Sequence, residues 1–204
     1  MRNTAIQFED TCYEVNGRRL VGPLDFGVRS GETVVLLGES GSGKTTTLRL
    51  INRLLDATSG SVRVEGRNVS EWDPVELRRR IGYVIQEVGL LPHLTVAENV
   101  ALVPILEKWP VRDCEERVRF LLDLVGLPPA EFLDRRPGEL SGGQRQRVGV
   151  ARALGADPPI LICDEAFGSV DPLTRVELRR EFKALVGKLE KTVGLQAVRV
   201  PDVV

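Results

Sequence analysis

The chain has 204 residues, of which 42% are hydrophobic and 28% are charged, a mixture typical of one globular domain. Its 29 acidic and 28 basic side chains leave a net charge of −1, which argues against binding nucleic acid by general electrostatic attraction. The longest apolar stretch, residues 100–106, is too short to span a bilayer, and residues 1–10 hold no apolar signal core. Three widely spaced cysteines match no metal-ligand spacing and suit a reducing compartment. Composition therefore predicts a soluble intracellular protein.

Strand patterns occupy most of the first 85 residues. Alternating or short apolar runs predict strands at residues 4–9, 24–29 and 33–37, with turns at Gly22-Pro23 and Ser30-Gly31.

From Lys44 the apolar spacing becomes helical and predicts a helix that ends before Ser59-Gly60. Beyond it the pattern predicts, in order, a strand at 61–65 with a turn at 66–68, a short helix at 74–80 and a strand at 82–85.

Helical spacing dominates the middle of the chain. It predicts helices at residues 95–108 and 111–125 and a short one after Pro128-Pro129. The remaining pattern predicts a helix at 143–154, a strand at 160–163 and a long helix at 172–189. We predict a single domain over residues 1–204, with an α/β core formed by 1–94 and 137–204 and a helical subdomain at 95–136.

A glycine-rich motif follows the strand at 33–37 and fits G-x-x-x-x-G-K-[ST] at every fixed position. Its glycines let backbone N–H groups surround phosphate oxygens, and the start of the next helix adds favourable partial charge. Lys44 is expected to reach the β- and γ-phosphates of a nucleotide, and Thr45 to bind Mg²⁺. The predicted nucleotide-binding residues of this segment are Gly38, Glu39, Ser40, Gly41, Ser42, Gly43, Lys44, Thr45 and Thr46.

Two carboxylates follow the apolar strand at 160–163. Ligands bind at the carboxyl ends of buried parallel strands, so Asp164 is placed to hold Mg²⁺. Glu165 is placed to orient an attacking water. Cys163 is interpreted as a small buried apolar residue and not as a reactive thiol.

A second candidate anion site is the pentapeptide Leu140-Ser141-Gly142-Gly143-Gln144. Ser141 can cap a helix whose first N–H groups are open to an anion. With this string the sequence resembles the ATP-binding cassette (ABC) ATPases, and the resemblance covers nearly the whole chain in the family's order. It implies a P-loop NTPase core with a mostly parallel central sheet, an N-terminal antiparallel β region and an inserted helical subdomain, with the family's C-terminal elements missing.

The resemblance also implies cofactors, partners and residue roles. Two ATPase chains, identical or homologous, would pack head to tail around Mg²⁺ and ATP, with Ser141, Gly142, Gly143 and Gln144 acting on the partner chain's ATP. Tyr13 would stack on adenine, and the alternative is an ordinary strand aromatic. Gln86 would sense Mg²⁺ and the attacking water, and Asp171 would shape the dimer interface.

The stretch at residues 81–104, together with Trp109, is most similar to the ATPases of importers of the glycine betaine, choline and proline branch, which transport osmoprotectants. This similarity implies transmembrane permease subunits as partners, a substrate-binding protein as an indirect partner, and a location on the inner face of the cell membrane. No nucleic acid partner is expected. No residue here is known to touch the cargo, so the cargo is assigned by analogy.

One departure from the family pattern stands out. ABC ATPases carry a switch histidine at the end of the strand after the long helix, whereas the single histidine of this chain, His93, lies elsewhere and is interpreted as a surface or packing residue. Alignment through Thr192 places Val198 where the histidine belongs, and Arg199 where an acidic residue is common. Three explanations stay open: a truncated or frameshifted end, a natural subunit that hydrolyses poorly, or slow turnover supported by Glu165 and Gln86.

The expected function is therefore the ATP-hydrolysing subunit of an ABC importer. The alternatives are an ATP-binding module with little or no hydrolysis, and a soluble ABC ATPase of DNA repair or translation. The short, slightly acidic single cassette argues against the last of these.

Overall fold

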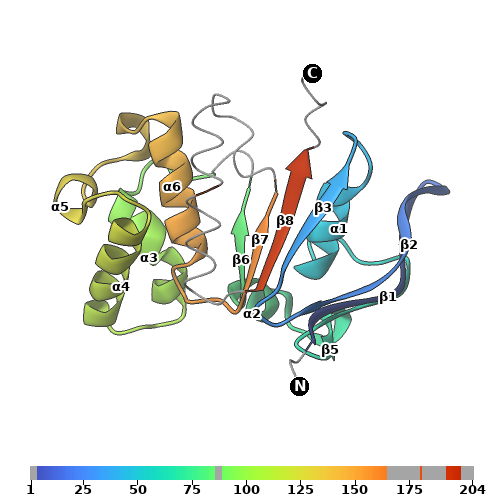
Figure 1. The fold of residues 1–204 in the computed structure, drawn as a ribbon. Coiled ribbons are helices and arrows are strands. Elements are labelled where there is room, and N and C mark those ends of the chain that lie inside the picture. The colour runs from blue at the N-terminus through green and yellow to red at the C-terminus, as the bar shows by residue number, and fades with distance from the viewer. Residues whose placement is uncertain (1–3, 86–88, 165–179, 181–191, 199–204) are drawn as a thin grey trace.

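In a computed structural model, the described part of the chain forms two sheets and a layer of helices (Figure 1). The structure describes residues 4–85, 89–164, 180 and 192–198. A parallel sheet lies in the middle of the view, the helices α3 to α6 gather on one side of it, and the antiparallel sheet lies on the other side (Figure 1). The α/β fold predicted from the sequence, with its N-terminal antiparallel region, is confirmed.

The antiparallel sheet has the strand order β2-β1-β4-β5, with β1 at Thr4–Val15, β2 at Arg18–Arg29, β4 at Ser59–Val64 and β5 at Arg67–Asn68. The first two strands form a long hairpin, closed by Asn16 and Gly17 with φ of 51° and 76°. Asn-Gly is the dipeptide that a tight hairpin turn favours, because both residues tolerate positive φ. The sequence prediction missed this turn and made both strands too short. It also placed Arg67 and Asn68 in a turn, whereas they form β5.

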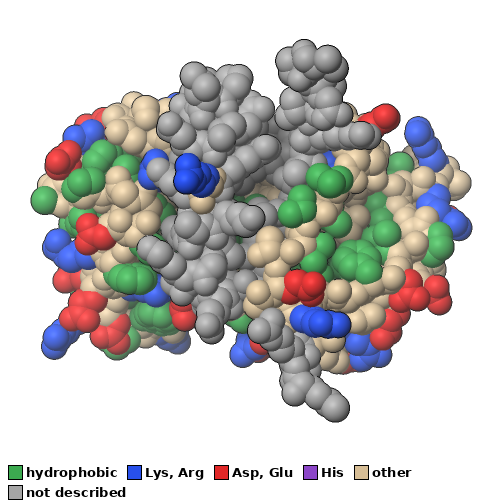
Figure 2. Space-filling model, in the orientation of Figure 1, with side chains coloured by type: hydrophobic (Ala, Val, Ile, Leu, Met, Phe, Trp, Pro, Cys, Tyr) green, Lys and Arg blue, Asp and Glu red, His purple; other side chains and the backbone are tan. Residues whose placement is uncertain are grey.

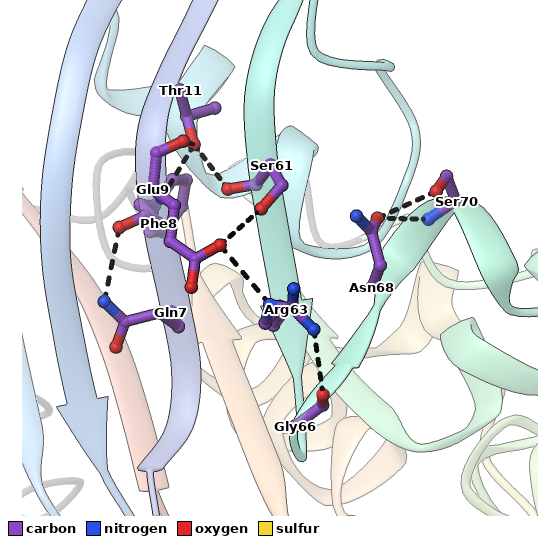
Figure 3. Close-up of polar contacts among 9 residues, drawn as sticks. All are labelled: Gln7, Phe8, Glu9, Thr11, Ser61, Arg63, Gly66, Asn68 and Ser70. Atoms are coloured by element: carbon purple, nitrogen blue, oxygen red, sulfur yellow. Dashed lines mark hydrogen bonds and ion pairs between the residues drawn. The ribbon is translucent and has the colours of Figure 1, made fainter.

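Side chains reinforce the pairing of β1 with β4 (Figure 3). The Thr11 hydroxyl donates to the Ser61 carbonyl at 2.6 Å, and the Ser61 hydroxyl donates to a Glu9 carboxylate oxygen at 2.8 Å. On the core side, the ring of Phe8 is fully buried and stacks on Phe26 of β2 at 4.7 Å between centroids. Polar contacts thus join β1 to β4, and the stacked rings join β1 to β2.

The dipeptide Gly22-Pro23 does not form the predicted turn. It lies inside β2, where the register with β1 shifts between the pairs Tyr13–Val21 and Thr11–Leu24. Gly22 has φ of 98°, and a Cβ at this position would collide with the Thr11 carbonyl oxygen. The glycine therefore allows a bulge against β1, and bulges of this kind are sites where a strand needs glycine.

The parallel sheet has the order β3-β8-β7-β6, formed by β3 at Thr33–Gly38, β6 at Ile81–Val84, β7 at Ile160–Cys163 and β8 at Thr192–Val198. β7 is buried on both faces: Ile160 and Ile162 join the core under the antiparallel sheet, and Leu161 and Cys163 join the core of the helical layer. A continuous apolar run is what such a strand requires. β8 lies between β3 and β7, and its last residue, Val198, pairs with Gly38.

The helix α1, Lys44–Ile51, is shorter than predicted. Leu48 and Ile51 are buried as the spacing indicated, but Arg53 has φ of 53°, a left-handed conformation that ends the helix, and Leu54 is 47% exposed. The short helix α2, Pro74–Arg79, begins as predicted with proline in its first turn and is capped by the Asp73 carboxylate. Only Arg180 of the predicted long helix at 172–189 is described, and it is helical.

The helical layer consists of α3 at Val96–Leu106, α4 at Val111–Leu124, α5 at Pro129–Phe132 and α6 at Gly142–Ala153. α6 packs against both α3 and α4, and all of them share one apolar core with β6 and β7. Two short 3₁₀ turns complete the described elements, at Val69–Glu71 and Pro137–Glu139. On the face shown in Figure 2, positively and negatively charged side chains are interspersed on the left and on the right of the view. None of the helices in the described ranges is long and apolar enough to cross a membrane.

Asn99 ties the loop before α3 to the helix. The side chain is fully buried; its amide donates to the carbonyls of Leu91, Leu94 and Thr95, and its oxygen accepts from the Leu91 N–H at 2.8 Å. Leucine would leave buried groups of this loop without partners, and such groups cost about 1–3 kcal/mol each. We expect Asn99→Leu to lower the free energy of unfolding by about 2–3 kcal/mol. Urea denaturation would measure this loss, and the control Ser70→Ala should stay within about 0.5 kcal/mol of the parent.

Candidate functional site

The glycine-rich loop connects β3 to α1 as the motif predicts (Figure 1). Gly41 and Gly43 have φ of 81° and 88°, in the left-handed region that favours glycine. A Cβ on Gly43 would lie 2.7 Å from the Val21 side chain and 2.8 Å from the Leu20 carbonyl oxygen. Backbone conformation and the close approach of β2 therefore both require glycine at the start of α1.

Lys44 points its ammonium group back into this loop. Nζ donates to the carbonyls of Gly38 at 2.9 Å and Glu39 at 2.7 Å, and to the Ser42 hydroxyl at 3.3 Å. The residue is only 8% exposed, and among the residues that the structure describes this positive charge is held by loop oxygens and not by a carboxylate. The first N–H groups of α1 lie beside it, and no side chain caps them, because Gly43 occupies the N-cap position. The loop thus presents the charge and the N–H groups that phosphate oxygens need.

Asp164 directly follows β7, and its carboxylate meets the first turn of α1. The Thr45 hydroxyl donates to Asp164 Oδ1 at 2.9 Å, across 119 residues of sequence. Asp164 is 6% exposed, and its backbone N–H is fixed by the Val84 carbonyl at 2.9 Å. The structure therefore brings together two of the three residues predicted to bind Mg²⁺; the third, Gln86, lies outside the described residues.

This pair of residues fits Mg²⁺. A hydroxyl and a carboxylate are hard oxygen ligands, and Mg²⁺ is commonly bound by one or two protein oxygens together with phosphate oxygens and waters. Within the described ranges, no three His, Cys, Asp or Glu side chains form a metal-binding cluster. Nucleotide and water oxygens would therefore complete the coordination. A bound Mg²⁺ would neutralise phosphate charge that develops during hydrolysis.

Tyr83 of β6 also contacts this carboxylate. Its hydroxyl donates to Asp164 Oδ2 at 3.0 Å. Burial, and then the Asp164 charge, raise the pKa of Tyr83 to about 12, while the Arg49 guanidinium acts in the opposite direction. The phenol stays protonated at neutral pH, so it remains a hydrogen-bond donor to the aspartate. Sequence analysis missed this residue, because Tyr83 reaches Asp164 only through the pairing of β6 with β7, which local sequence patterns do not reveal.

A solvent-accessible cavity of about 650 Å³ opens beside these groups. Thr45, Arg49, Tyr83 and Asp164 form its polar wall, and its apolar wall is formed by Leu54, Leu55 and Ile85. One of these lining residues, Ile85, directly follows β6 and precedes Gln86 in the sequence.

The signature pentapeptide starts α6 as predicted. Ser141 caps the helix: its Oγ accepts from the Gln144 N–H at 3.2 Å, and the Gln144 side chain accepts from the Ser141 N–H at 2.9 Å. Ser141 and Gly142 are exposed, and a Cβ on Gly142 would meet nothing within 4 Å. No packing among the described residues explains this glycine, and none of these residues occupies the space beside it at the start of α6.

The other predicted site residues are only partly described. Glu165, Gln86 and Asp171 lie outside the described residues. Tyr13 is half-buried in β1 and pairs with Val21 of β2. Because Val21 approaches Gly43, β2 lies between the strand of Tyr13 and the phosphate loop. The remaining loop residues, Ser40 and Thr46, lie where the motif placed them, before and within α1.

Two further predictions concern single residues. His93 is exposed in the loop before α3, as the surface interpretation required. Cys163 is fully buried, and burial raises the pKa of its thiol, which agrees with its assignment as a packing residue.

Comparison with known proteins agrees with this arrangement. The family model for ABC transporters matches residues 21–168, which include the phosphate loop, the signature helix and Asp164. The chain belongs to the ABC transporter family of ATP-binding proteins.

The predicted likeness to one branch of this family is also confirmed. The chain is 52% identical over 177 residues to the glycine betaine/carnitine/choline transport ATP-binding protein OpuCA of Bacillus subtilis, covering 87% of this chain and 46% of the relative. It is 49% identical to the osmoprotectant import ATP-binding protein OsmV of Salmonella typhimurium, again with 87% and 46% covered. The chain thus spans a little under half the length of these two relatives.

Solved structures of ABC cassettes have the same fold. The chain superposes on CbiO1 from Clostridium perfringens, part of an ABC transporter complex, with a TM-score of 0.87 at 24% identity, covering 97% of this chain and 79% of the other. It also superposes on the dimeric ATP-binding cassette MJ0796 bound to ADP and Pi, with a TM-score of 0.81 at 30% identity, covering 94% and 87%.

Proposed function

We propose that the chain is the ATP-binding and ATP-hydrolysing subunit that energises an ABC importer for quaternary amine osmoprotectants. The observation that carries the ATPase part is the meeting of Lys44, Thr45 and Asp164 around one phosphate loop. The cargo part rests on relatives about half identical to this chain, whose names describe them as ATP-binding proteins for the transport of glycine betaine, carnitine and choline.

In this proposal each loop residue has one task toward Mg·ATP. Backbone N–H groups of residues 38–46 bind phosphate oxygens, and Lys44 neutralises the β- and γ-phosphates. Thr45 and Asp164 hold Mg²⁺, with Gln86 as a further ligand. Glu165 orients the attacking water as general base, and Tyr13 stacks on adenine.

The proposed active form is a head-to-tail dimer with a second copy or a homologous ATPase chain. Ser141, Gly142, Gly143 and Gln144 of one chain then meet the ATP held by the other, and Asp171 contributes to the interface. The open space beside Gly142 and the dimeric state of the solved MJ0796 cassette support this assembly. The α6 N-terminus adds favourable partial charge toward the partner's phosphates.

Substitutions at the signature and at the general base should move dimerisation in opposite directions. Ser141→Arg should block the Mg·ATP-dependent dimer, because a long side chain would fill the space meant for the partner's phosphate. Glu165→Gln should favour the dimer, because it removes a negative charge near the γ-phosphate. Size-exclusion chromatography with Mg·ATP measures both effects. The same monomer–dimer balance in the parent and both variants would contradict the proposed interface, provided that both variants show the parent's unfolding midpoint.

The proposed partners in the membrane are permease subunits, with a substrate-binding protein acting through them. The chain would lie on the inner face of the cell membrane. Uptake of labelled glycine betaine, choline and carnitine by cells that co-express the chain with a candidate permease and binding protein tests the cargo.

The alternative function, an ATP-binding module with little hydrolysis, is favoured by the absence of a histidine at position 198. Calorimetry of Mg·ATP binding together with phosphate release by the purified protein separates the two functions. Binding without turnover, in the dimer as well as in the isolated chain, would support the alternative.

A further inference from the structure

Both oxygens of the Asp164 carboxylate accept a hydrogen bond, and the two donors come from different elements. Oδ1 accepts from Thr45 at the start of α1, and Oδ2 accepts from Tyr83 in β6. Parallel pairing places Tyr83 beside Ile162 of β7, two residues before the aspartate. The phenol therefore reaches along the sheet toward the strand end, a distance that its long rigid ring can span.

The two donors differ in what Mg²⁺ would do to them. A hydroxyl that binds a metal presents its lone pair, so Thr45 must turn its proton away from Asp164 when it becomes a ligand. Tyr83 lies on the other carboxylate oxygen and is free to keep its hydrogen bond. The tyrosine is then the side-chain contact that fixes the carboxylate plane with Oδ1 toward Thr45.

We propose that Tyr83 is a positioning residue that orients Asp164 for Mg²⁺ in the Mg·ATP site. This inference rests on the proposed function and adds a residue to it. A residue that hydrogen-bonds to a metal-ligating carboxylate sets the orientation and basicity of that carboxylate. Loss of such a residue typically lowers metal affinity or activity about 10–100-fold. Tyr83→Phe would retain the ring in the cavity wall and remove the hydroxyl, which donates to Asp164 and also interacts with the Arg49 guanidinium.

The decisive measurement is the affinity for Mn²⁺, used as a paramagnetic substitute for Mg²⁺, by electron paramagnetic resonance in the presence of ATP. We expect Tyr83→Phe to weaken Mn²⁺ binding about 10-fold or more. ATP affinity measured in EDTA and the urea unfolding midpoint should stay at the parent values. The matched control is Ser61→Ala, which removes a hydroxyl that donates to the Glu9 carboxylate at 2.8 Å in the antiparallel sheet (Figure 3).

A second measurement uses the parent protein alone and so does not depend on the variant folding. The chain has two tyrosines, so tyrosine labelled with ¹³C at the single Cζ position gives two carbon resonances, one from Tyr13 and one from Tyr83. Replacing ATP–EDTA by Mg·ATP should shift the Tyr83 resonance, because the charge of its acceptor is shared with the metal. Mn²⁺ should broaden the same resonance.

The outcomes separate the two proposals. No Mn²⁺–ATP binding by the parent would refute the proposed function. Normal binding by the parent with equal Mn²⁺ affinity in Tyr83→Phe would overturn the role of Tyr83 alone. An equal loss of metal-free ATP affinity or of stability in Tyr83→Phe would show that the tyrosine acts through packing, which also overturns it.

Discussion

Replacement of Lys44 by alanine is expected to abolish tight ATP binding. The ammonium group is held inside the loop by the Gly38 and Glu39 carbonyls, in a residue that is only 8% exposed. A charge in this position makes charge-assisted hydrogen bonds to phosphate, worth about 1.5–3 kcal/mol each. Loss of two such bonds lowers ATP affinity by about 100-fold or more.

Calorimetry at fixed salt measures this loss, and two variants make it interpretable. Lys44→Met keeps most of the buried chain length and removes only the charge, so it should lose nearly as much affinity as Lys44→Ala. Lys108→Ala removes an exposed lysine two residues after the end of α3 and should bind ATP like the parent. ATP affinity near the parent value in Lys44→Met would show that phosphate binds elsewhere.

The second large effect concerns hydrolysis. Phosphoryl transfer depends on positioned donors around the γ-phosphate, and removal of one typically costs about 10²–10³ in rate. The single histidine of this chain, His93, is exposed in the loop before α3. We therefore expect Mg·ATP to bind while hydrolysis by the parent protein stays slow.

The register of β8 indicates where a donor could be restored. Val198 is the last residue of this strand and pairs in parallel with Gly38, the first residue of the phosphate loop. Val198→His should raise the turnover number by about 10-fold or more with little change in ATP affinity. Steady-state phosphate release measures this gain, and Val198→Ala is the control for altered size. Fast hydrolysis by the parent would show that the histidine is dispensable, and no gain in Val198→His would show that β8 does not bring position 198 to the γ-phosphate.

The sequence by itself determined the local parts of the site. The phosphate loop needs glycines, a lysine and a threonine within eight consecutive residues, and the Ser141–Gln144 cap spans four, so both are readable from short-range spacing. The apolar run of β7 likewise predicted a buried strand with Asp164 at its end. Lengths were less accurate: a single left-handed residue, Arg53, ended α1 early, and a bulge replaced the turn expected at Gly22-Pro23.

Only the tertiary structure decided how these parts meet. The contacts of Asp164 with Thr45 and Tyr83 join residues 119 and 81 positions apart, and they exist because parallel strands separated by long connections end at the same edge of one sheet. The insertion of β8 between β3 and β7, which pairs Val198 with Gly38, is equally non-local. Hydrophobic periodicity tells which face of a strand is buried, but it carries no information on which neighbour the strand pairs with, so strand order had to come from the folded chain.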